Sequence, residues 1–159
     1  MKKDFVAGKK WDSNAVRMMQ KQRVLFLCTH NSARSQMAEG LLRALYGDRC
    51  EVLSAGTEPT SVHPLAVQVM AEIGIDISGH QSKSVDKFRN LSFDFVVTVC
   101  DRAKEQCPWF PGARHFLHHS FEDPTRVRGS ELDRLAAFRR VRDQLRHWII
   151  RTFGAAEQQ

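Results

Sequence analysis

The chain has 159 residues, of which 42% are hydrophobic and 26% charged, with a formal net charge of +6. This length suits one domain around a single core, and no run is apolar enough to cross a membrane. Most of the excess charge lies in residues 1–23, so the rest of the chain is nearly neutral. A nucleic-acid surface needs cations clustered on the folded face. We therefore expect neither nucleic acid nor a membrane as a partner.

The chain is predicted to divide into three parts. Residues 1–22 form a basic extension, residues 23–153 a single domain and residues 154–159 a short tail. The first residues lack the apolar stretch of a signal peptide, which favours a cytoplasmic location. We also expect a monomer. Because the cytoplasm keeps thiols reduced, the four cysteines are better explained as reactive or core residues than as disulfides.

Apolar patterning predicts strands and helices that alternate along the chain. The predicted strands cover 24–27, 51–55, 93–99 and 114–117, and the predicted helices cover 35–46, 64–73 and 130–153. Gly47 and Gly74 stand where the first two helices should end. Alternating strands and helices imply parallel pairing with right-handed crossovers. We therefore predict an α/β fold, a three-layer sandwich with a central four-stranded parallel sheet.

The loop between the first strand and the first helix has the composition of an oxyanion site. A loop that leads from a strand into a helix leaves backbone N–H groups unpaired, and the helix N-terminus adds partial positive charge. The guanidinium of Arg34 can grip two oxygens at once. The residues predicted to bind a tetrahedral oxyanion are Thr29, His30, Asn31, Ser32, Ala33 and Arg34.

Cys28, the first residue of this loop, is the predicted nucleophile. Amide dipoles and the charge of Arg34 predict a thiol pKa well below the free value of about 8.5. Ser35 is expected to donate its hydroxyl to the thiolate and to cap the helix. His30 either tunes the pKa of Cys28 or faces solvent.

Two more cysteines follow the strand 93–99. Cys100 stands at its carboxyl end, the edge of the sheet where Cys28 also lies, and six residues separate it from Cys107. A thiol relay with Cys28, a metal pair and inert core thiols are all compatible with this spacing. The sequence leaves the three interpretations open.

Asp123 precedes Pro124 in a predicted loop. A carboxylic acid held there can protonate a departing oxygen, and an ordinary turn explains the same pair of residues. Adjacent histidines such as His118 and His119 point to opposite faces of a strand. We therefore expect no metal site.

These motifs resemble the thioredoxin-coupled arsenate reductases, which share the low-molecular-weight protein tyrosine phosphatase fold, over residues 23–153. The matching segments are CTHNSARSQMAEG from Cys28, SAG from Ser54, GIDIS from Gly74, VVTVC ending at Cys100, Cys107-Pro108, Asp123-Pro124 and FRRVRD from Phe138. The resemblance implies arsenate as substrate, with phosphate or sulfate as analogues, and thioredoxin as an external reductant in place of a bound cofactor.

The resemblance also implies a mechanism. Cys28 attacks arsenic held by the loop and Arg34, while Asp123 protonates the departing oxygen. Cys100 then attacks Cys28 and releases arsenite. Cys107 takes over the disulfide, which thioredoxin reduces.

The chain departs from the family pattern at two positions. Ala33 replaces a second loop cysteine that lies outside the relay, so turnover should be unaffected. Lys83 stands where some members carry an aspartate of a potassium site, and its ammonium is predicted to replace the cation. Three alternatives remain: a tyrosine phosphatase, in which an aromatic residue would usually replace Thr125; reduction by glutaredoxin or a small thiol; and a non-enzymatic oxyanion sensor.

Overall fold

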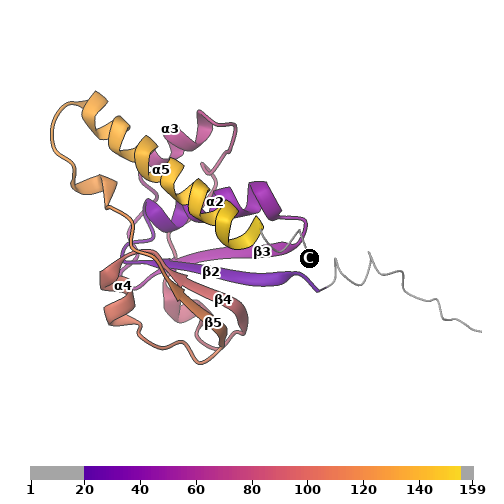
Figure 1. The fold of residues 1–159 in the computed structure, drawn as a ribbon. Coiled ribbons are helices and arrows are strands. Elements are labelled where there is room, and N and C mark those ends of the chain that lie inside the picture. Colours follow the sequence, from indigo (N-terminus) through magenta and orange to yellow (C-terminus); the bar gives the residue numbers. More distant parts are fainter. Residues whose placement is uncertain (1–19, 155–159) are drawn as a thin grey trace, which may run out of the picture.

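The computed structural model describes residues 20–154 (Figure 1). Most of the predicted basic extension, and all of the predicted tail except Gly154, lie outside this range. A four-stranded sheet with all strands parallel, in the order β3-β2-β4-β5, forms the centre. In chain order the elements are β2 (Gln22–Cys28), α2 (Arg34–Tyr46), β3 (Cys50–Gly56), α3 (Pro64–Ala71), η1 (Val85–Phe88), β4 (Phe93–Thr98), α4 (Asp101–Gln106), β5 (Ala113–His118), η2 (Pro124–Arg126) and α5 (Glu131–Phe153).

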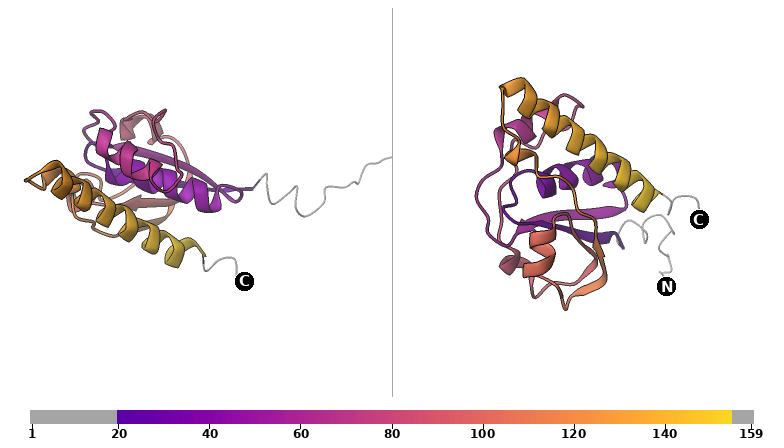
Figure 2. Two further views of the ribbon diagram at one scale, coloured as in Figure 1. Left: turned by 90° about the horizontal axis from the view of Figure 1, so that it is seen from above. Right: turned by 60° about the vertical axis from the view of Figure 1, so that its left-hand side comes forward.

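The sheet separates two apolar cores. Helices α2, α3 and α5 cover one face, as Figures 1 and 2 show, while η1 and the segment after α4 cover the other. Alternate residues of β2 enter different cores, so that Phe26 and Cys28 lie in the first and Leu25 and Leu27 in the second. This alternation is the period of two expected of a strand buried on both faces. The arrangement confirms the predicted three-layer α/β sandwich.

The ends of the helices show where local sequence determined the structure. The long helix α5 begins with a capping box, in which Ser130 and Asp133 each accept a hydrogen bond from the other's backbone N–H. Gly47 ends α2, as predicted. The predicted cap at the start of α2 was wrong, because the helix begins at Arg34 and its N-cap is Ala33 without a side-chain hydrogen bond. Ser35 already lies in the first turn, and its hydroxyl has another partner.

Helix α4 was not predicted, and α3 ends two residues before the predicted boundary.

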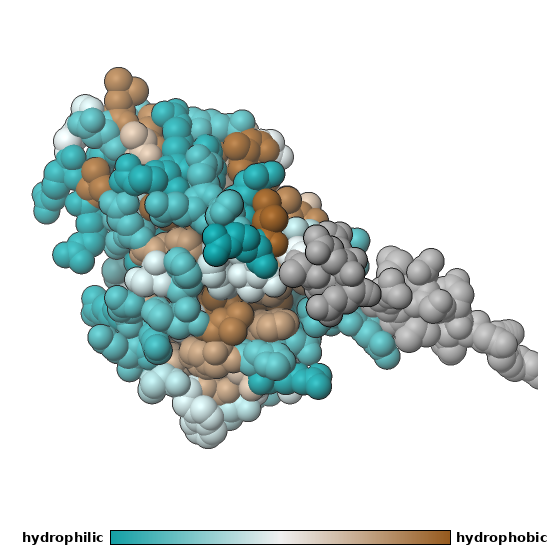
Figure 3. Space-filling model, in the orientation of Figure 1, coloured by the Kyte–Doolittle hydropathy of each residue, from teal (hydrophilic) through white to brown (hydrophobic). Residues whose placement is uncertain are grey.

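The face of the molecule drawn in Figure 3 is largely hydrophilic, with apolar residues in separate patches. Within residues 20–154, no helix has both the length and the apolar composition that a bilayer span requires.

Candidate active site

The loop between β2 and α2 is organised around the side chain of Asn31. This residue is fully buried and has a φ of 50°, in the left-handed region that asparagine tolerates better than most residues. Its Nδ2 donates to the hydroxyls of Ser35 at 2.7 Å and Ser54 at 2.9 Å. Its Oδ1 accepts from Gln36 Nε2 at 3.0 Å and from the Lys83 backbone N–H at 2.8 Å. Asn31 therefore ties the loop to α2, to β3 and to the segment before η1.

The thiol of Cys28 lies inside this loop and is 3% exposed. Its Sγ is 2.8 Å from Ser35 Oγ and accepts the Asn31 backbone N–H at 3.2 Å. Since Ser35 accepts a hydrogen bond from Asn31, its own hydroxyl hydrogen is free to point at the sulfur. The predicted contact between Ser35 and Cys28 is therefore present.

The predicted lowering of the Cys28 pKa was wrong. Burial raises the pKa of this thiol, because a thiolate loses hydration in the interior. The hydrogen bonds from Ser35 and the charge of Arg34 act in the opposite direction and offset burial only in part. The thiol therefore keeps its proton more strongly than a free cysteine does.

Arg34 and Asp123 face each other across the mouth of the loop. Arg34 Nη1 donates to the Phe121 carbonyl at 3.0 Å, and Nη2 lies 3.4 Å from Asp123 Oδ2. The other oxygen of Asp123 accepts from the backbone N–H and the hydroxyl of Thr125, at 3.0 and 2.7 Å. Asp123 thus caps η2 and also points one oxygen at the site. The two roles that the sequence left open for this residue are therefore compatible.

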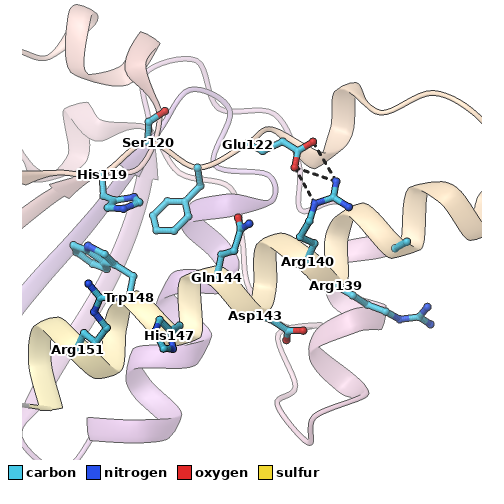
Figure 4. Close-up of a pocket in the computed structure, with 12 residues that line it drawn as sticks. His119, Ser120, Glu122, Arg139, Arg140, Asp143, Gln144, His147, Trp148 and Arg151 are labelled. Carbon is cyan, nitrogen blue, oxygen red and sulfur yellow. Dashed lines mark hydrogen bonds and ion pairs between the residues drawn. The ribbon is translucent and has the colours of Figure 1, made fainter.

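These groups surround a cavity of about 140 Å³. Its lining residues are Cys28, His30, Ser32, Ala33, Arg34, His63, Asp123 and Thr125. Among the predicted binding residues, Thr29 and Asn31 do not line it, because their side chains contact Cys100 and the hydrogen-bond network described above. A wider groove of about 980 Å³ lies between residues 119–122 and α5 (Figure 4), and no predicted site residue lines it.

The second thiol, Cys100, lies beside the loop. It is the N-cap of α4, and its Sγ accepts the Ala103 backbone N–H at 3.4 Å. The hydroxyl of Thr29, the residue after Cys28, is also 3.4 Å from the Cys100 sulfur. Cys28 and Cys100 belong to the same core. The predicted convergence of these two thiols at one end of the sheet is present.

The third thiol, Cys107, lies on the other side of the sheet. It ends α4, is buried with Phe93 and Phe110, and its thiol donates to the Trp109 carbonyl at 3.8 Å. Seven residues of helix span about 10 Å, whereas a disulfide requires Cα atoms within about 7 Å. A bond between Cys100 and Cys107 therefore requires α4 to unwind.

Side chains on the outside of α4 hold it in place. Glu58 Oε2 accepts from Arg102 and from Gln106, both at 2.9 Å. At the start of the helix, Asp101 pairs with His118 at 2.9 Å. These groups are largely exposed, and such ion pairs are each worth less than about 1 kcal/mol. These outer side-chain contacts therefore add little to the cost of opening α4.

Beneath the loop, Lys83 extends toward a buried carboxylate. Its Nζ lies 3.8 Å from Glu39 Oε1, an oxygen that also accepts the Ser54 hydroxyl at 2.5 Å. Burial lowers the pKa of Lys83, and the charge of Glu39 partly restores it. An ammonium group thus lies beside Glu39, the carboxylate that also binds Ser54.

His63 is the residue that sequence reasoning missed. It precedes α3, 35 residues after Cys28, and it enters the cavity wall only because the chain folds back onto the loop. Its position before Pro64 indicated a helix start, but nothing in its neighbourhood indicated contact with the oxyanion site.

Known proteins share this architecture. Residues 23–153 match the family model of the low molecular weight phosphotyrosine protein phosphatases. The arsenate reductases of Halalkalibacterium halodurans and Bacillus subtilis are 45% and 43% identical over 127 residues, 80% of this chain and 91% of each relative. The structure of an arsenate reductase in the phosphate binding state has a TM-score of 0.70 at 35% identity, covering 80% of this chain and 93% of that chain.

A thioredoxin-dependent arsenate reductase of Corynebacterium glutamicum has a TM-score of 0.60 at 30% identity. The match covers 80% of this chain and 60% of that longer chain. The chain therefore belongs to the low molecular weight phosphotyrosine protein phosphatase family and, within it, to the arsenate reductases.

Proposed function

We propose that this enzyme reduces arsenate through the thiols of Cys28, Cys100 and Cys107, with thioredoxin as the external reductant and without a bound cofactor. The observation that carries the proposal is the position of Cys100, whose sulfur touches Thr29 next to the nucleophile. Phosphate ester hydrolysis needs only one thiol. Reduction needs a second thiol, which attacks the sulfur of the first and forms a disulfide with it. A reducing compartment such as the cytoplasm would keep these thiols free.

The first step joins sulfur to arsenic. Arg34 and the loop amides hold arsenate over Cys28, and the sulfur attacks arsenic while an As–O bond breaks. Asp123 donates the proton with which the departing oxygen leaves as water. Because burial raises the Cys28 pKa, the thiol proton must be removed during binding, and the arsenate dianion is itself a suitable base. The Ser35 hydroxyl then stabilises the thiolate.

The second step carries the redox change. The Cys100 thiolate attacks Cys28 Sγ, and the electron pair of the S–As bond remains on arsenic, which leaves as arsenite. Two thiols are oxidised to one disulfide as arsenic(V) gains two electrons. Cys107 then attacks Cys100, frees Cys28 and leaves a disulfide for a dithiol reductant.

A phosphatase is the main alternative, because arsenate and phosphate present the same tetrahedral charge to the loop. Thr125 argues against an aryl phosphate as the main substrate, since its hydroxyl binds Asp123 and it has no ring to pack on a substrate. We expect a residual aryl phosphatase activity that requires Cys28 but neither Cys100 nor Cys107.

The decisive experiment follows arsenate-dependent NADPH oxidation with thioredoxin and thioredoxin reductase. We expect Cys28→Ser, Cys100→Ser and Cys107→Ser each to abolish turnover. Cys50→Ser is the matched control, because Cys50 is also buried but starts β3, away from the cavity. If Cys107→Ser keeps its activity with glutaredoxin or a small thiol, that reductant replaces thioredoxin. If the wild-type protein hydrolyses an aryl phosphate but reduces no arsenate, the phosphatase alternative is correct. An oxyanion sensor would bind arsenate and turn over neither substrate.

A further inference from the structure

The ring of His63 is held in the cavity wall by contacts on several sides. Its backbone N–H donates to the Ser32 carbonyl at 3.0 Å, which joins the start of α3 to the loop. Its Nδ1 accepts the Leu65 backbone N–H at 3.1 Å and thereby caps α3. Its ring packs against Phe138 of α5, with the two centroids 4.8 Å apart. The imidazole therefore has little freedom to turn.

These contacts fix which nitrogen carries the hydrogen. A nitrogen that accepts a hydrogen bond has no hydrogen of its own, so the neutral ring is protonated at Nε2. Burial lowers the pKa of His63, and Arg134 adds to this effect while Asp123 opposes it. The neutral form is therefore the one present near pH 7.

The Nε2–H group is available to a ligand. Within residues 20–154, the one buried side-chain nitrogen or oxygen without a hydrogen-bond partner is Nε of Arg23. His63 Nε2 has no hydrogen-bond partner among the described residues, so it is open to the cavity or to solvent rather than sealed in the core. The ring thus presents one unused donor.

We propose that His63 is an additional substrate-binding residue, whose Nε2–H donates a hydrogen bond to an oxygen of the bound tetrahedral oxyanion. This inference rests on the proposed function, since it takes the cavity over Cys28 as the oxyanion site. The cavity of about 140 Å³ is small, and Cys28, Arg34 and His63 all line it. An oxyanion in contact with the first two lies within reach of the third.

Two substitutions separate the donor from the helix cap. Asparagine is among the best N-cap residues, so His63→Asn keeps the bond to Leu65 but ends short of the position of Nε2. Glutamine is one methylene longer and is not a favoured cap, so His63→Gln supplies an N–H farther out and weakens the start of α3. The measurements are the dissociation constant of inorganic phosphate by titration calorimetry and the Tm by circular dichroism.

We expect His63→Asn to keep the helix cap, to lose Tm only through the packing of the ring on Phe138, and to bind phosphate about tenfold more weakly, the loss typical of one hydrogen bond to a charged group. We expect His63→Gln, which loses the same packing and also the cap, to melt about 3 °C below His63→Asn while binding phosphate within about threefold of wild type. Unchanged affinity in His63→Asn, or affinity that falls with Tm in both variants, would overturn the inference. A wild-type protein that binds no phosphate would instead remove the oxyanion site and the proposed function with it.

Discussion

Replacing Asn31 tests whether one side chain holds the catalytic loop. Asn31 is fully buried, and its amide makes four hydrogen bonds, to Ser35, Ser54, Gln36 and the backbone of Lys83. Asn31→Ala leaves these partners without their bonds, and each unsatisfied buried group costs about 1–3 kcal/mol. Alanine at a φ of 50° adds about 1 kcal/mol of backbone strain.

The contributions belong to one network and are not additive. We therefore expect the unfolding free energy to fall by about 4 kcal/mol, at the upper end of single substitutions, as measured by urea denaturation. Phosphate affinity should fall as well, because Asn31 positions both the Ser35 hydroxyl and the Cys28 sulfur.

Asn31→Gly is the matched control for this experiment. It loses the same hydrogen bonds but tolerates positive φ without strain, so it should lie about 1 kcal/mol closer to wild type. A loss below about 1 kcal/mol in Asn31→Ala would contradict the network argument. Equal stability of the alanine and glycine variants would contradict the strain argument.

Other contacts around the loop predict the outcome of further changes. In Gly56→Ala the new Cβ would lie 2.6 Å from the Thr29 carbonyl oxygen, so we expect lower Tm and lost phosphate binding; wild-type values would show that the loop can shift. If the Lys83 ammonium replaces a potassium ion, Lys83→Asp should acquire a Tm that is higher in KCl than in NaCl, whereas equal values would reject the replacement. Glu58→Gln loosens α4 and should speed formation of the second disulfide up to about fivefold in stopped-flow experiments; a slower step would show that α4 assists the exchange. Because the folded pKa of Cys28 is raised, its contribution to stability is complete below the unfolded value of about 8.5 and is lost as pH rises through the folded value. Because burial also raises the pKa of Cys50, urea denaturation against pH should show a smaller loss in Cys28→Ser than in the wild type.

Much of the site was predictable because its parts are local in sequence. The apolar run of β2 and the helical periodicity of α2 are both visible in the sequence. Cys28 and Arg34 therefore had to lie at the two ends of the short loop between them. Sequence spacing also placed Cys100 correctly, because parallel strands end at a common edge. Helix α4 was missed because its six residues contain a single buried side chain, Ala103, too few to produce a helical period.

The failures concern burial and contacts between distant segments. The sign of the Cys28 pKa shift depends on how completely the loop is enclosed, and residue type does not reveal this. The pairing of Arg34 with Asp123 joins residues 89 positions apart, and it depends on the packing of α5 under Phe121. His63 reaches the same cavity by the course of the chain between β3 and α3. Each of these features depends on tertiary packing, which the local sequence does not encode.

The distribution of the thiols between the two cores determines how a relay can operate. Cys28 and Cys107 lie in different cores, so the sheet separates the nucleophile from the thiol that would meet the reductant. Cys100 stands at the carboxyl edge of the sheet, between the end of β4 and the start of α4. It contacts the loop through Thr29 and is joined to Cys107 by the six residues of α4. In the proposed relay, transfer between the outer two thiols therefore passes through Cys100, and the opening of α4 would separate the oxyanion chemistry from regeneration.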